Sequence, residues 1–65
     1  MKDETKKVIA LFPNLQEGIT VGVDVKSNGG DRVEIRRDGV LCWRSFEFEP
    51  DFYNDLEKNL KWASR

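Results

Sequence analysis

The sequence predicts an α+β fold in which a three-stranded antiparallel meander packs against helices. Apolar and polar residues alternate in three successive runs, short glycine-containing turns separate these runs, and a stripe of apolar residues at helical spacing follows them. We expect strands over about residues 19–27, 31–37 and 40–48 and a C-terminal helix over about residues 50–63. The 65 residues are expected to form one small domain, because a chain of this length buries only about 60% of its surface on folding.

The N-terminal segment has two interpretations. Val8 and Phe12 lie one helical turn apart, and Pro13 would end a helix just before it, which predicts a short helix over about residues 3–12. The apolar run that ends at Phe12 is also compatible with a fully buried fourth strand. We favour the helix and keep the strand as the alternative.

The first predicted strand alternates strictly. Its apolar members are Ile19, Val21, Val23 and Val25. Because successive side chains of a strand point to opposite faces, these residues should share one face of the sheet. A loop over residues 28–30 would pair Val25 with Val33. Val23 would then lie opposite Ile35, and both strands would present their apolar side chains to one core.

The second hairpin is predicted by Asp38 and Gly39. An Asp-Gly pair suits a two-residue type I′ turn, because both central residues of that turn have positive φ. The turn would pair Ile35 with Cys42 on the inner face, where we expect the thiol to be buried and unreactive. The same register would place Trp43 on the outer face of the sheet.

Arg44 does not fit this alternation, because it falls among the inward-facing positions of the third strand. Either a β-bulge near residues 43–45 turns Arg44 outward, or the residue lies at the sheet edge with its guanidinium in water. Further along the strand, Phe46 and Phe48 are expected on the inner face and Glu47 on the outer face.

Pro50 is expected to open the C-terminal helix, since proline is favoured at the first helical position. The apolar stripe of this helix consists of Phe52, Leu56, Leu60 and Ala63. This spacing is typical of a helix that packs on a sheet.

The side chains argue against catalysis. The chain has no histidine and one cysteine, which excludes Ser-His-Asp and Cys-His arrangements, an intramolecular disulfide and an ordinary zinc finger. The glycines form no phosphate-binding motif, and the carboxylates between residues 47 and 55 suit a helix N-terminus better than a metal site. We therefore expect no enzyme activity, no metal and no cofactor.

Composition also bounds the partners. Eleven basic and twelve acidic side chains give a net charge of −1, so no global field attracts nucleic acid or anionic lipid. No apolar run approaches the roughly 20 residues that span a bilayer, and the first residues do not resemble a signal peptide. We expect a cytoplasmic protein with no membrane partner.

The candidate binding site lies on the outer face of the predicted sheet. Alternation places a large aromatic ring there, opposite Glu34 and with an arginine on each diagonal. The candidate residues are Trp43, Leu41, Arg32, Arg36 and Lys26. Tryptophan and arginine are enriched at interaction hot spots. Stacking of Arg36 on the indole within the molecule is the purely structural alternative.

These residues predict a non-catalytic binding module that contacts another protein, as a regulator or inhibitor, or that associates with its own copies. The alternative is a single-stranded nucleic-acid-binding domain, in which Trp43 stacks on a base and the basic side chains contact phosphates.

Overall fold

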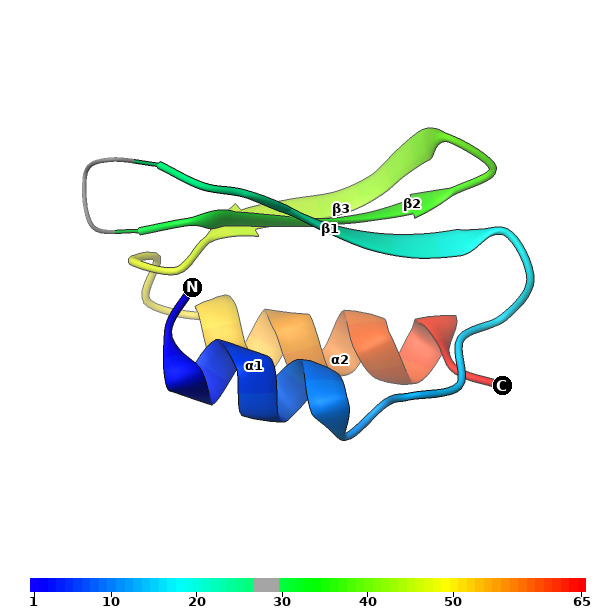
Figure 1. Ribbon diagram of the computed structural model, residues 1–65, viewed down its shortest axis with the longest axis horizontal. Coiled ribbons are helices and arrows are strands. Elements are labelled where there is room, and N and C mark those ends of the chain that lie inside the picture. Colours follow the sequence, from blue (N-terminus) through cyan, green and yellow to red (C-terminus); the bar gives the residue numbers. More distant parts are fainter. Residues whose placement is uncertain (27–29) are drawn as a thin grey trace.

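The computed structural model describes residues 1–26 and 30–65 of the chain (Figure 1). The elements follow one another as α1 (Asp3–Ala10), β1 (Ile19–Asp24), β2 (Arg32–Arg37), β3 (Val40–Phe46) and α2 (Phe52–Ala63). The strands form one antiparallel sheet in the order β1-β2-β3. The α+β fold with an N-terminal helix is confirmed, and the alternative of an N-terminal fourth strand is wrong.

Both helices lie on the same side of the sheet (Figure 1). The buried apolar residues are Ile19, Val33, Ile35, Phe52, Leu56, Leu60 and Ala63. All four residues of the stripe predicted for the C-terminal helix are among them, so that stripe is the buried face of α2. No described element covers the opposite side of the sheet, which we call the outer face.

Most helix and strand ends lie within two residues of the expected ones, and β1 ends three residues earlier than expected, at Asp24. The third strand ends at Phe46, because a turn follows in which the Glu49 N–H donates to the Phe46 carbonyl at 3.0 Å. Pro50 lies in this connection, and α2 begins at Phe52. At the other helix, the Leu11 and Phe12 N–H groups bond to carbonyls three residues earlier, which tightens the last turn after Ala10.

The first hairpin pairs its strands in a different register from the expected one. Val23 lies opposite Val33, and Val21 lies opposite Ile35. The shift is two residues, so the faces are as predicted while the pairing of Val25 with Val33 is wrong. The carboxylate of Asp31 accepts a hydrogen bond from the Lys26 N–H at 3.2 Å in place of a strand partner, which ends the ladder earlier. Residues 28 and 29 of the expected loop lie outside the described part of the chain.

The turn of the second hairpin is as expected. Asp38 has a φ of 51° and Gly39 a φ of 83°, which are the positive values that a type I′ turn requires. Alanine at position 39 would have to adopt the left-handed conformation that glycine occupies without strain.

A β-bulge follows this turn at Cys42. Arg36 pairs with Leu41 and Ile35 pairs with Trp43, so that Cys42 is an extra residue on β3. Beyond the bulge the alternation is reversed. Trp43 therefore lies on the inner face, and the expected placement of Trp43 on the outer face is wrong.

The energetics of burial explain why the chain forms the bulge. It costs the ladder about one hydrogen bond, with a net value of roughly 1 kcal/mol. In exchange, Trp43 packs against the core, and burying a large apolar side chain contributes about 2–3 kcal/mol. The guanidinium of Arg44 is exposed to solvent, where it needs no buried partner. Of the two explanations for Arg44, the bulge is correct, although it lies one residue before the expected stretch.

The bulge also exposes the thiol of Cys42, which corrects the expectation of a buried cysteine. We predict that Cys42 reacts with a disulfide reagent such as Ellman's reagent in the native protein almost as fast as in urea, because the fold does not shield it. Stopped-flow absorbance measures both rates. Native reaction slower by a hundredfold would contradict the exposed position.

Candidate functional site

The outer face presents three rows of side chains across the strands. From β1 to β3 the rows are Thr20, Arg36 and Leu41, then Gly22, Glu34 and Arg44, then Asp24, Arg32 and Phe46. The face thus carries a continuous line of charged residues along β2, with an arginine, an aromatic ring and an aliphatic side chain along β3. Nothing in the described chain lies over it (Figure 1).

The charges along β2 are bound to one another. Arg36 Nε lies 2.9 Å from Glu34 Oε1, and Arg36 Nη1 donates to the Gly39 carbonyl at 3.0 Å. Asp24 Oδ2 lies 3.1 Å from Arg32 Nη2 and 2.9 Å from Lys26 Nζ. All three predicted binding cations, Arg32, Arg36 and Lys26, are therefore held in an ion-pair ladder.

The ladder shifts the titration of its members. The hydrogen bond from Arg36 holds the pKa of Glu34 below its usual range, and the same bond raises the pKa of Arg36. The hydrogen bond from Lys26 lowers the pKa of Asp24 in the same way. These shifts favour the charged forms of Asp24, Glu34 and Arg36 at neutral pH, and the ladder alternates in sign along its length.

The structure brings four of the five predicted site residues to this face. Leu41, Arg32, Arg36 and Lys26 belong to it, with Lys26 attached through Asp24. Trp43 does not, because its ring packs on the core with its centroid 6.2 Å from that of Phe52. The intramolecular stacking of Arg36 on this indole is also ruled out by the opposite faces on which the two side chains lie.

Sequence reasoning missed two aromatic residues at the end of β3. The rings of Phe46 and Phe48 stack with their centroids 5.2 Å apart, and 67% of Phe48 is exposed. Phe48 rests against Gly30, where a Cβ would lie 2.7 Å from Phe48 Cδ2, so that only glycine permits this approach. Arg44 lies two residues before Phe46 on the same face and forms no ion pair with any described residue. We call Arg44, Phe46 and Phe48 the β3 patch.

A buried carboxylate, that of Glu47, joins several elements behind this patch. Glu47 is 5% exposed. Its Oε2 accepts hydrogen bonds from the Thr5 hydroxyl at 2.6 Å and the Lys2 N–H at 2.9 Å, and its Oε1 accepts one from the Asp31 N–H at 2.9 Å. The Thr5 hydroxyl also lies 3.1 Å from the Tyr53 hydroxyl of α2. The expectation that Glu47 points outward is wrong, because the bulge reverses the alternation of β3.

Two opposing effects set the pKa of Glu47. Burial acts to raise it, but the accepted hydrogen bonds, led by that from Thr5, outweigh burial and hold the pKa below its usual range. The pKa of Asp31 is also lowered, by the Met1 ammonium 2.6 Å away and by the Lys26 N–H. Since hydrogen bonds from the fold occupy both Glu47 oxygens, this carboxylate has a structural role.

Acid should destabilise the protein, because five carboxyl groups have a lowered pKa in the fold. They are Asp24, Asp31, Glu34, Glu47 and Glu49. Such groups stabilise the fold above their unfolded values, 3.8 for aspartate and 4.5 for glutamate, and the stabilisation is lost as the pH falls through the folded pKa. We expect urea titrations to give a constant free energy of unfolding from neutrality to about pH 5.5 and a steady fall below about pH 5. An unchanged free energy at pH 3 would contradict this prediction.

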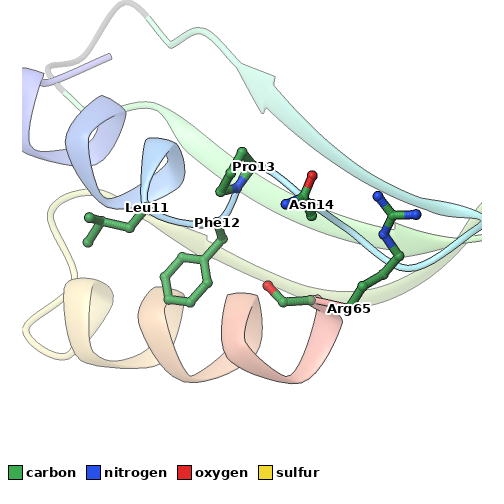
Figure 2. Close-up of a pocket in the computed structure, with 6 residues that line it drawn as sticks. Leu11, Phe12, Pro13, Asn14 and Arg65 are labelled. Atoms are coloured by element: carbon green, nitrogen blue, oxygen red, sulfur yellow. The ribbon is translucent and has the colours of Figure 1, made fainter.

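The described surface also has a small pocket between the end of α1 and the C-terminal residues (Figure 2). Its volume is about 230 Å³, and its lining is Leu11, Phe12, Pro13, Asn14, Ser64 and Arg65. Phe12 extends from the end of α1 toward α2 (Figure 2). The Arg65 N–H donates to the Asn14 carbonyl at 3.0 Å, which ties the two walls together. No acidic or nucleophilic pair lines the pocket, so we do not place the functional site there.

Comparisons with family models, with curated proteins and with solved structures give no match. Function must therefore be inferred from the site itself. Residues 1–26 and 30–65 contain no cluster of three metal-ligating side chains. No described helix is both long and apolar enough to cross a membrane.

Proposed function

We propose that this protein is a non-catalytic module that binds another protein through the outer face of its sheet, with the β3 patch as the anchor. The observation that carries the proposal is the stack of half-buried Phe46 and exposed Phe48 beside Arg44, which forms no ion pair with a described residue, on a sheet face that no described element covers. Phenylalanine and arginine side chains are both enriched in the cores of protein interfaces. A reducing compartment such as the cytoplasm suits the exposed thiol.

The charges of the outer face favour an acidic partner. Four cations and two carboxylates lie on this face, which leaves a surplus of two positive charges although the whole chain is slightly acidic. The carboxylates already bind the arginines of β2 and Lys26. Arg44 is therefore the cation that can meet a partner carboxylate without first breaking an ion pair. Leu41 extends the apolar part of the surface along β3.

The test is capture of a partner by the immobilised protein, followed by cross-linking and mass spectrometry. We expect Arg44→Glu and Phe48→Ala each to weaken the affinity for the captured partner at least tenfold. Lys58→Glu is the matched control, since it reverses a charge on the exposed surface of α2 and should leave the affinity unchanged. Equal loss for all three variants, or loss for Lys58→Glu alone, would place the interface elsewhere. Circular dichroism checks that each variant is folded.

Single-stranded nucleic-acid binding is the alternative function, and it would use other residues than those expected from the sequence. Trp43 packs on the core and is not placed to stack on a base, so Phe48 would have to supply the stacking surface and Arg44 the phosphate contact. The exposure of Phe48 is the observation that keeps this function as a second proposal. It predicts that a labelled single-stranded oligonucleotide binds at low salt and dissociates as salt is raised. No change in anisotropy at low salt would exclude it.

A further inference from the structure

A separate feature of the sheet is the free edge of β1. The sheet has the order β1-β2-β3, so β1 and β3 are both edge strands. The edge of β3 is interrupted by the bulge at Cys42, and bulges are one of the devices that prevent edge-to-edge pairing. β1 pairs with β2 without interruption over all six residues. β1 is therefore the edge at which a further strand can be added.

The pairing pattern shows which backbone groups of β1 are free. The Asp38 N–H donates to the Gly18 carbonyl at 2.9 Å, and hydrogen-bonded pairs alternate along an antiparallel ladder. The residues of β1 that bond to β2 are therefore Thr20, Gly22 and Asp24. The N–H and C=O groups of Val21 and Val23 point away from the sheet, and they bond to no described residue outside it.

Apolar side chains accompany these free backbone groups. Val21 and Val23 lie on the helix side of the sheet, where Val23 is 37% exposed. Val25, just past the strand, is 76% exposed. On the helix side of the sheet, the helices thus leave the β1 edge uncovered. An edge with free hydrogen-bonding groups and exposed β-branched side chains is a template for strand addition.

We propose that the occupant of this edge is a second copy of the chain, paired β1 to β1 in antiparallel order about a two-fold axis at Val23. In this register Val23 faces its own copy and Val21 faces Val25 of the other protomer. All these valines lie on the same side of the joined sheet and bury one another, while the free backbone groups bond across the axis.

The outer face of the joined strands supports the same register. Asp24 would lie opposite Gly22 of the other protomer, so that no like charges are placed directly opposite each other. Asp24 is also neutralised within its own protomer by Lys26 and Arg32. Thr20 would lie opposite Lys26. In the resulting six-stranded sheet, the two β3 strands form the outer edges and each carries its β3 patch. The dimer therefore leaves the proposed protein-binding surface open.

Sedimentation equilibrium in reducing buffer tests the proposal. Over a concentration range from micromolar to millimolar we expect the mass to rise from 7.6 kDa toward twice that value. Val23→Pro should abolish this rise and remain folded, since it removes an N–H that faces solvent in the monomer. Val40→Lys changes a valine on the other edge that is more exposed than Val23, and this variant should still dimerise. A constant mass of 7.6 kDa at every concentration overturns the proposal.

A cross-link tests the register without depending on the stability of the proline variant. In a Cys42→Ser background, Val23→Cys should form an intermolecular disulfide on mild oxidation, because position 23 faces its own copy. The matched variant, Val40→Cys in the same background, should remain monomeric. Faster cross-linking at position 40 than at position 23 would move the interface to β3 and overturn the proposal. Neither variant alters the β3 patch, so failure here leaves the proposed protein binding untouched.

Discussion

Replacing Glu47 with alanine is expected to leave most of the protein unfolded at room temperature. The substitution removes the acceptor of three hydrogen-bond donors. These donors are the Lys2 N–H, the Thr5 hydroxyl and the Asp31 N–H. Each buried donor without a partner costs roughly 1–3 kcal/mol. Thr5 retains the Tyr53 hydroxyl as a partner, so the total should be about 3–5 kcal/mol. A domain of this length is seldom more stable than about 3–5 kcal/mol.

Two further variants make this prediction specific. Glu47→Gln keeps one oxygen for the Asp31 N–H and turns an amide toward the Thr5 hydroxyl, which can accept, so its free energy of unfolding should lie between those of wild type and alanine. Glu57→Gln is the control, because it removes only a surface pair with Lys61 at 3.6 Å, worth about 0.3–0.5 kcal/mol. Urea titration followed by circular dichroism ranks the three. Equal stability of Glu47→Ala and Glu57→Gln would show that the Glu47 hydrogen bonds do not support the fold.

The fold was predictable from the sequence because its main signals are local. The strict alternation in residues 19–25, the Asp38-Gly39 turn and the helical stripe from Phe52 to Ala63 each specify an element through neighbouring residues. The first hairpin shows that such local signals do not determine the register of strand pairing. A register shift of two residues keeps every side chain on its face, so alternation alone does not distinguish the two registers. The pairing depends on Asp31, whose hydrogen bonds reach Lys26 and Glu47.

The candidate site was predicted only in part, and a single residue explains the failure. Arg32 and Arg36 of β2 lie before the bulge, and their expected placement on the outer face is correct. Beyond Cys42, the expected faces of Trp43, Ser45 and Phe46 are wrong, which moved Trp43 out of the core and hid Phe46. The misfit of Arg44 was the available signal. An arginine at an inward position costs more than one ladder hydrogen bond, which favours a bulge at some point before Arg44.

Because Trp43 packs on the core and is not a surface anchor, its removal should lower the stability of the fold. Trp43→Ala should destabilise the fold by roughly 2–4 kcal/mol, because it opens a cavity beside Phe52 and Ile35 in a core with few large residues. Trp62→Ala is the matched control. Trp62 is 48% exposed and is covered on one side by Arg37, 4.7 Å from its centroid, so its loss should cost about 1 kcal/mol. Urea titrations of both variants decide between core and surface: if Trp43→Ala is as stable as Trp62→Ala, the ring does not support the core, and the reversal of β3 at Cys42 is wrong.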